Sequence, residues 1–290
     1  MDKILKIVII NKIIFKIKIM SLEILKKYKI KAKKGLWQNF LVNDKAITKI
    51  ANITDVEWKN IIEVWPGYWA LTEKLVNLKP KSLNLVELDP DMIDILNDRV
   101  ENNDFDLENI DFTINRKDIL KYEPQNKEYS VIANIPYYIT SPILRHFLYN
   151  VENKPETMVI LMQQEVAEKI MLNFKNKSSV LSLFIEKKSD VTYEQDVPKD
   201  FFVPSPKIDS AVLLFKYNNK FEEIDDDKFF KLIKIWFAAT RKMLVKNFTN
   251  WWFEKDYIIQ LFDELWIEKT VRWEDLDIAM WCELVKKINN

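Results

Sequence analysis

The chain has 290 residues, of which 48% are hydrophobic and 30% charged, enough for one large or two modest domains with a core. Its 44 basic side chains balance 44 acidic ones, which excludes a protein attracted to nucleic acid by net charge, so any such surface must come from local clustering. The single cysteine excludes an internal disulfide and fits a reducing cytoplasm. One cysteine and one histidine do not suffice for a Cys/His zinc site, so we expect no metal.

Glycine and tryptophan occur in unusual numbers. The chain has two glycines, whereas about 20 are expected at the usual frequency of ~7%, and it has ten tryptophans. Tight turns often need glycine, because other residues rarely adopt a left-handed backbone. The residues that stand at the turns of this chain are therefore informative.

Residues 1–20 are rich in isoleucine and lysine. Lysine interrupts every apolar run, so the segment is no transmembrane span, and it lacks the small-residue cleavage site of a signal peptide. A membrane-surface helix remains an alternative, but we expect a misplaced start, with Met20 as the initiator. We expect no membrane partner and a cytoplasmic protein.

Six lysines follow between Lys26 and Lys34. Such a run is typical of a solvated helix end and loop. Because it leads directly into a predicted cofactor-binding region, a surface that contacts phosphates is an equally good interpretation.

Residues 61–75 predict a strand, a tight turn and a helix. Ile61, Ile62 and Val64 give an apolar, β-branched run of the kind found in parallel sheets. Pro66-Gly67 breaks this run, and Ala70–Leu75 resumes with helical spacing. This arrangement presents backbone N–H groups and a helix N-terminus to a cofactor. The turn calls for glycine, yet Trp65 and Trp69 flank Gly67.

Two acidic residues follow the next predicted strands. Ser82–Leu88 is expected to be a buried strand, and its Glu87 lies about 20 residues past the turn, where a carboxylate can accept hydrogen bonds from ribose hydroxyls. This pattern alone does not separate S-adenosylmethionine from NAD. Phe112–Asn115 is the third expected strand, and Asp118 after it is either a cofactor contact or a helix cap.

The fourth expected strand, Tyr129–Ala133, leads into the segment Asn-Ile-Pro-Tyr-Tyr that begins at Asn134. The Asn134 side-chain oxygen and a nearby backbone carbonyl can accept the two N–H groups of an exocyclic amine, a poor nucleophile that needs positioning. Pro136 fixes the loop, and Tyr137 offers a face on which a flipped base can stack. We expect His146, on the following helix, to be a packing residue.

The remaining elements complete an α/β fold. We expect a fifth strand at Thr157–Met162, closing antiparallel strands at Asp190–Asp196 and Ser210–Phe215, and helices at 90–100 and 178–187. The stiff loop between the closing strands carries Phe202, which can pack against a target base or within the core, and Lys207, which can meet a phosphate. Residues 217–227 are polar and acidic, and 228–290 have helical periodicity throughout.

Five segments in this order resemble the small-subunit ribosomal RNA adenine dimethyltransferases. They are Leu-Trp-Gln-Asn-Phe-Leu from Leu36, Glu-Val-Trp-Pro-Gly-Tyr-Trp-Ala-Leu-Thr from Glu63, Asn-Ile-Pro-Tyr-Tyr-Ile-Thr-Ser-Pro from Asn134, Phe-Val-Pro-Ser-Pro-Lys-Ile-Asp-Ser from Phe202, and Ala-Thr-Arg-Lys-Met-Leu from Ala239. The resemblance covers about residues 22–290.

The resemblance implies a Rossmann-like α/β methyltransferase domain at 21–216, a linker at 217–227 and a helical RNA-binding domain at 228–290, after a non-native extension at 1–20. It implies dimethylation, from S-adenosylmethionine, of two adjacent adenosines in the 3′-terminal hairpin of small-subunit rRNA, by a monomer acting on a pre-30S-type particle. The implied catalytic residues are Asn134, Pro136 and Tyr137; the implied cofactor contacts are Gln38, Asn39, Leu41, Glu63, Trp65, Gly67, Glu87, Asp118 and Asn134; and the implied RNA contacts are Lys33, Lys34, Phe202, Lys207, Arg241 and Lys242.

Several tryptophans stand where the family has glycine, which favours the hypothesis that UGA codons are read as glycine by the source cell. Trp37, Trp65 and Trp69 fall on motif glycines, Trp236 precedes Phe237 where the family often has Gly-Phe, and Trp58, Trp266 and Trp273 lie where a turn glycine would be ordinary. Trp251, Trp252 and Trp281 are not assigned in this way. The alternative is a genuinely tryptophan-rich, diverged chain.

Three rival functions follow from the same residues. If Trp65 and Trp69 are genuine, we expect their rings to fill the cofactor cleft and leave a non-enzymatic ribosome-assembly factor. The related large-subunit rRNA methyltransferases that confer antibiotic resistance are a close alternative, against which Ser141-Pro142 and Asp209 speak. An NAD-dependent enzyme is disfavoured, because it has no use for the segment that begins at Asn134.

Overall fold

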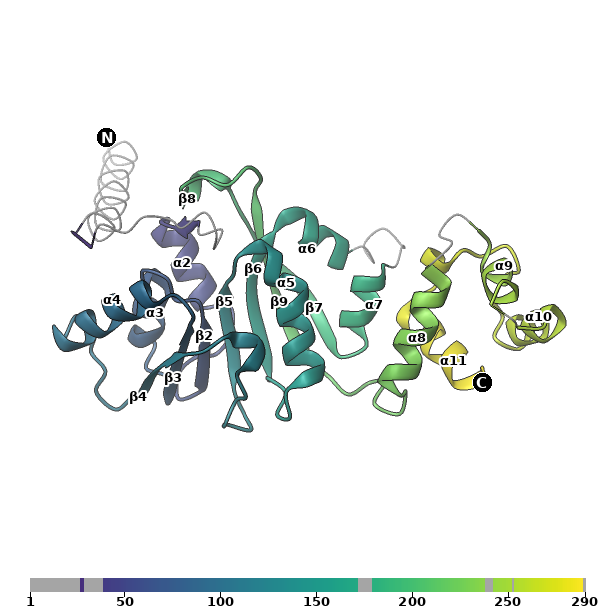
Figure 1. The fold of residues 1–290 in the computed structure, drawn as a ribbon, viewed down its shortest axis with the longest axis horizontal. Coiled ribbons are helices and arrows are strands. Elements are labelled where there is room, and N and C mark those ends of the chain that lie inside the picture. The colour runs from purple at the N-terminus through teal and green to yellow at the C-terminus, as the bar shows by residue number, and fades with distance from the viewer. Residues whose placement is uncertain (1–26, 29–38, 172–178, 238–241, 252, 289–290) are drawn as a thin grey trace, which may run out of the picture. The chain divides into compact units, whose positions relative to one another are not determined.

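The computed structural model describes residues 27–28, 39–171, 179–237, 242–251 and 253–288 (Figure 1). Of these, the residues up to Ala167 together with Thr192–Lys216 form one compact unit, and Glu168–Val191 with the residues from Tyr217 onwards form another. The first contains most of the predicted sheet domain. The segment 168–191, which we expected in that domain, groups instead with the C-terminal helices.

The first unit is built on a seven-stranded sheet of order β4-β3-β2-β5-β6-β9-β7. Its strands are β2 (Asn60–Val64), β3 (Ser82–Glu87), β4 (Asp111–Arg116), β5 (Ser130–Asn134), β6 (Thr157–Gln163), β7 (Ser189–Val197) and β9 (Ser210–Tyr217). The first five are parallel, and β9 runs antiparallel to β6. The Rossmann-like α/β fold predicted from the sequence is thereby confirmed.

The central parallel strands are buried on both faces of the sheet, whereas β4 at its edge is largely exposed. In β2, Ile61 and Val64 are completely buried, and the central residues of β5 and β6 are buried in the same way. The connecting helices are α2 (Asp44–Ala51), α3 (Ala70–Asn77), α4 (Pro90–Glu101), α5 (Thr140–Arg145) and α6 (Gln164–Ile170). The sheet and its helices therefore share one apolar core.

Local capping fixes where the helices begin. The Asn43 side chain accepts a hydrogen bond from Ala46 N at 3.0 Å at the start of α2, and Asp89 accepts one from Asp91 N at 3.0 Å at the start of α4, where Pro90 occupies the first turn. The helix α3 begins differently, with Trp69 at its N-cap and no side-chain hydrogen bond. This cap belongs to the turn described below.

The strand order places the ends of three strands together. β3 and β4 lie on one side of β2, and β5 and β6 lie on the other, so the chain reverses direction across the sheet between β2 and β5. In register, Val64 lies opposite Val86 and Ala133. Ligands of open α/β sheets bind at the carboxyl edge next to such a reversal.

Two further strands of two residues each, β1 (Phe40–Leu41) and β8 (Phe202–Val203), pair antiparallel outside the main sheet. Phe40 lies opposite Val203 and Leu41 opposite Phe202, and Val42 N donates to Phe201 O at 2.7 Å. We did not predict this pair from the sequence. It joins segments that are far apart along the chain.

The second unit is helical in its C-terminal part. It contains α7 (Val180–Glu186), α8 (Asp226–Phe237), α9 (Leu244–Thr249), α10 (Lys255–Glu264) and α11 (Ile278–Lys287). Their apolar side chains form a core that includes Phe248, Phe262 and the fully buried Trp281. Lys187 is also fully buried; its Nζ donates to Ile224 O at 2.8 Å and to the Asp226 carboxylate.

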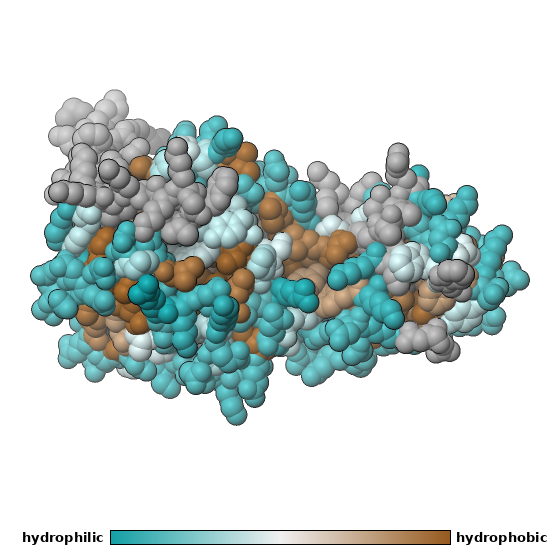
Figure 2. Space-filling model, in the orientation of Figure 1, coloured by the Kyte–Doolittle hydropathy of each residue, from teal (hydrophilic) through white to brown (hydrophobic). Residues whose placement is uncertain are grey.

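On the face shown in Figure 2, hydrophilic residues predominate, with smaller apolar areas between them. Within the described ranges, no helix is both long and apolar enough to cross a membrane.

Candidate active site

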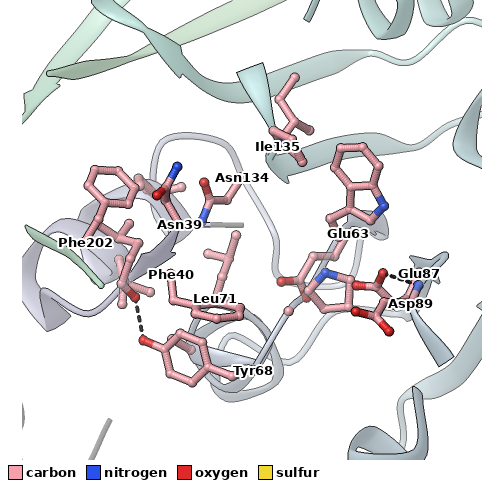
Figure 3. A pocket seen from close by; sticks show the side chains of 18 of the residues that line it. Asn39, Phe40, Glu63, Tyr68, Leu71, Glu87, Asp89, Asn134, Ile135 and Phe202 are labelled. Atoms are coloured by element: carbon pink, nitrogen blue, oxygen red, sulfur yellow. Dashed lines mark hydrogen bonds between the residues drawn. The ribbon is translucent and has the colours of Figure 1, made fainter. Parts of the chain in front are cut away.

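A pocket opens at the carboxyl edge of the sheet, where β2, β3 and β5 end (Figure 3). Its walls come from β1, the turn after β2, the end of β3, the loop after β5, and Phe202 of β8. In Figure 3, Phe202 and Asn39 lie at one end of the view, Glu87 and Asp89 lie at the other, and Asn134 lies between them. Segments from five parts of the chain thus meet around one space.

The turn after β2 is left-handed at three positions. Trp65, Gly67 and Trp69 have φ angles of 56°, 55° and 74°. Trp65 N donates to Val86 O at 3.0 Å, and Trp69 N donates to Pro66 O at 2.9 Å, which closes the turn before α3. The turn therefore bends as a glycine-rich turn does, although two of its left-handed positions hold tryptophan.

One side of the pocket is fixed by aromatic packing. The rings of Phe40 and Tyr68 meet edge to face with centroids 5.6 Å apart, and Tyr68 Oη donates to Leu41 O at 2.5 Å. The β1–β8 pair then places Phe202, which is 3% exposed, in the same wall. A hydroxyl from the turn thus ties the turn to β1.

Two buried carboxyl groups line the pocket. Burial raises the pKa of Glu63, from an ordinary value of 4.5 to about 8; the nearby Thr72 hydroxyl lowers it in part, and the charge of Glu87 raises it. Geometry argues against a full hydrogen bond to Thr72, because neither Glu63 Oε2 nor Thr72 Oγ1 has a well-aligned partner among the described residues. Glu63 is therefore a neutral acid at pH 7.

Glu87 is held at the end of β3 by backbone donors. Its Oε1 accepts hydrogen bonds from Leu88 N and Asp89 N, both at 2.8 Å. Burial raises its pKa to about 7, and these N–H groups hold it lower than burial alone would. The side chain is thus oriented by the backbone and can accept hydrogen bonds from a ligand's hydroxyl groups.

The segment after β5 lines the same pocket. Asn134 ends the strand, Ile135 is buried, and Tyr137 begins a short 3-10 helix at Tyr137–Ile139. Tyr137 Oη lies 2.9 Å from Ser210 Oγ, so its ring is anchored to β9. Tyr138 is 56% exposed. The segment thus presents an amide, a fixed ring and an exposed ring at the pocket.

The structure brings ten of the predicted site residues to this pocket: Asn39, Leu41, Glu63, Trp65, Gly67, Glu87, Asn134, Pro136, Tyr137 and Phe202. Asp118 does not line it; its Oδ1 accepts a hydrogen bond from Leu120 N at 3.0 Å and caps a 3-10 helix, the alternative weighed above. Lys207 and Lys242 are exposed and also lie outside the pocket lining. Lys33, Lys34, Gln38 and Arg241 lie outside the described residues.

The expectation that both turn tryptophans would fill the cleft is wrong for Trp69. Its side chain is completely buried and is not among the lining residues. The Arg99 guanidinium lies 4.8 Å from its ring centroid, and Arg99 also stacks on Phe105. Trp65 does line the pocket, which remains open beside it.

The sequence did not single out Tyr68, Asp89 or Tyr138, all of which line the pocket. The link between Tyr68 and Leu41 depends on a contact between distant segments, so no local pattern could reveal it. Asp89 directly follows the Glu87-Leu88 pair at the end of a predicted strand, and that position was a usable signal. His146 is a packing residue, as predicted; it is 4% exposed and its Nε2 lies 2.9 Å from Tyr122 O.

The fold and this site define a class. The chain has a doubly wound sheet with a left-handed turn after its first strand and a carboxylate at the end of the second. The segment Asn-Ile-Pro-Tyr follows at the end of the fourth strand. Together these features make the chain a Rossmann-like, S-adenosylmethionine-dependent methyltransferase.

Comparison with known proteins specifies the family. The family described as ribosomal RNA adenine dimethylase matches residues 29–290, and the chain belongs to this family of enzymes. Proteins named ribosomal RNA small subunit methyltransferase A are similar: that of Mesoplasma florum is 35% identical over 89% of this chain and 99% of its own length, and that of Mycoplasmopsis pulmonis is 38% identical over 80% and 89%.

Solved structures share the fold. A dimethyladenosine transferase from Plasmodium falciparum aligns with a TM-score of 0.72 at 22% identity, over 83% of this chain and 94% of that one. The 23S rRNA methyltransferase ErmE aligns with a TM-score of 0.68 at 19% identity, over 86% and 98%. One of these two structures is named for 23S rRNA, so the shared fold does not decide which RNA this chain modifies.

Proposed function

We propose that the chain dimethylates the amino nitrogens of two adjacent adenosines in the 3′-terminal hairpin of small-subunit rRNA. The observation that carries the proposal is that Asn134, Pro136 and Tyr137 line the same pocket as Glu87. The names of the similar proteins support the small subunit over the large one.

The residues of the pocket fit S-adenosylmethionine. Glu87 is oriented by two backbone N–H groups and can accept hydrogen bonds from ribose hydroxyls, while Glu63, with a buried oxygen that lacks a well-aligned partner in the described part of the chain, adjoins the turn. Asn39 and Leu41 line the same space. The cofactor supplies a methyl group already activated on a sulfonium, so the protein needs no strong general base.

The target base would be held by the segment after β5. The Asn134 side-chain oxygen can accept one amino N–H, which keeps the nitrogen in line and leaves its lone pair toward the cofactor. Tyr137, fixed by Ser210, and Phe202 offer faces for stacking. Because Tyr138 is largely exposed, it can meet the flanking nucleotides.

The RNA contacts are proposed to extend beyond the pocket. Lys207 and Lys242 are exposed and can neutralise phosphates, as can the lysines between Lys26 and Lys34.

We propose a monomer that acts without a metal on a pre-30S-type particle in the cytoplasm. Replacing Lys207 with Ala should weaken particle binding at low salt and flatten the salt dependence; an unchanged dependence would remove that contact.

The test uses undermethylated small subunits and large subunits as separate substrates. We expect methyl transfer to the small subunit, mapped by primer extension to two adjacent adenosines, and a loss of about a hundredfold or more for Asn134→Ala. The exposed Asn97→Ala variant on α4 is the matched control and should keep full activity. Transfer to large-subunit RNA alone would refute the proposal.

A further inference from the structure

Four tryptophans have the left-handed backbone that normally selects glycine. Trp58, Trp65, Trp69 and Trp266 have φ angles of 58°, 56°, 74° and 55°, close to the 55° of Gly67. A Cβ clashes with the neighbouring carbonyl in this region, and for a bulky side chain the conformation is a genuine outlier. Four such outliers of one residue type call for a common cause.

Trp266 has this strained left-handed backbone although its side chain is almost fully exposed. It follows α10, where Ile267 N donates to Phe262 O at 2.8 Å and Trp266 N donates to Asp263 O at 3.3 Å. This is the Schellman ending, whose left-handed position is usually glycine and sometimes asparagine. The Trp266 side chain is 93% exposed, so no packing offsets its strained backbone.

The end of α4 shows the same geometry with an ordinary occupant. Asp104 N donates to Arg99 O at 2.9 Å and Asn103 N donates to Val100 O at 3.0 Å, and the left-handed residue is Asn103. The chain thus follows the usual rule at one helix end and breaks it at another with tryptophan.

Trp58 and Trp69 support the same conclusion in different surroundings. Trp58 N donates to Lys79 O at 3.1 Å in a turn before β2, and its side chain is 68% exposed. Trp69 is completely buried, yet its Nε1 has no hydrogen-bond partner among the described residues. Buried tryptophan usually finds a partner for this group.

We infer that positions 58, 65, 69 and 266 are glycine in the native chain, because the source cell decodes UGA as glycine. The composition agrees, since glycine is about tenfold scarcer than usual while tryptophan is abundant. Positions 58 and 266 lie outside the pocket, so the inference does not rest on the proposed function. It does not extend to Trp281, inside α11, or to Trp273, because neither is left-handed. Within the pocket, glycine at position 65 removes an indole from the wall beside the cofactor-binding turn.

The direct test reads the four codons and the masses of peptides from the protein isolated from source cells. The chain expressed with tryptophan at all four positions provides the mass standard. We expect UGA codons and glycine in all four native peptides. UGG codons, or tryptophan in the native peptides, would overturn the inference whether or not the protein methylates RNA.

A second test isolates the backbone contribution. Trp266→Gly and Trp266→Ala both remove the exposed indole, so their difference reports the left-handed conformation. We expect the Gly variant to have an unfolding constant lower than that of the Ala variant by about fivefold or more. Gln260, exposed within the same helix, is the matched control, and there the Ala variant should be the more stable by about fivefold. An Ala variant at 266 as stable as the Gly variant would overturn the backbone argument.

Discussion

Replacing Glu63 with Gln should remove a specific part of the pH dependence of stability. Native Glu63 stays protonated up to a pKa of about 8, whereas the unfolded chain releases this proton near pH 4.5. Between these values the native state binds more protons, so the contribution is fully present below pH 4.5 and is lost as the pH rises through 8. Glutamine has nearly the same shape and cannot ionise.

The magnitude follows from the two pKa values. Between pH 6 and pH 8 the Glu63 carboxyl should cost the parent chain about 2 kcal/mol of unfolding free energy that Glu63→Gln does not lose. With a urea slope of about 1–3 kcal/mol per molar, the unfolding midpoint of the parent chain should fall by about 1 M relative to that of Glu63→Gln between pH 6 and pH 8. Glu87, with a pKa of about 7, adds a loss of the same sign in both chains; because its charge acts on Glu63, only the part of this loss that does not depend on Glu63 cancels in the comparison.

The assay is urea unfolding of the full chain at pH 6, 7 and 8, followed by fluorescence. Glu101→Gln, on the exposed surface of α4, controls for the loss of one carboxyl group and should follow the parent chain. Parallel pH curves for the parent chain and Glu63→Gln would refute the reasoning, because they would show that Glu63 is ionised in the native state.

Two further changes test other parts of the molecule. Tyr68→Phe removes the hydroxyl that donates to Leu41 O and should lower the unfolding free energy by about 1–3 kcal/mol in urea; an unchanged midpoint would contradict this. Asp226→Ala leaves the buried Lys187 ammonium without its carboxylate and should lower the unfolding free energy by about 3 kcal/mol. The control Lys220→Ala breaks an exposed ion pair and should lower it by less than about 1 kcal/mol. Equal losses in the two variants would show that burial does not set these energies.

Local patterns predicted the positions of the strands well, because β2, β3, β5 and β6 are largely buried, mostly apolar runs between breakers. The run expected at Ser82–Leu88 is the strand Ser82–Glu87, and that expected at Phe112–Asn115 is Asp111–Arg116. The same patterns placed Glu87 and Asn134 at the carboxyl edge of the sheet, whereas Asn39 and Leu41 were predicted only from the resemblance to the family.

What the sequence did not predict depends on contacts between distant segments. The β1–β8 pair has two residues in each strand, too few for a periodic signal, and the Tyr68 hydroxyl finds Leu41 through space. The burial that makes Glu63 a neutral acid is likewise a property of the assembled core. Trp69 was expected in the cleft, but the space beside Arg99 and Phe105 could not be seen from the turn alone.

The β1–β8 pair joins two distant segments of the chain into one wall of the pocket. Leu41 and Phe202 lie opposite each other in a two-residue ladder, and no further strand of the described residues pairs with it, so a shift of one displaces the other. A molecule that orders Leu41 therefore also restricts Phe202, and the entropy lost in that step is not lost again by a second molecule that packs on Phe202. By linkage the benefit is reciprocal, so a molecule that packs on Phe202 also raises the affinity for one that orders Leu41.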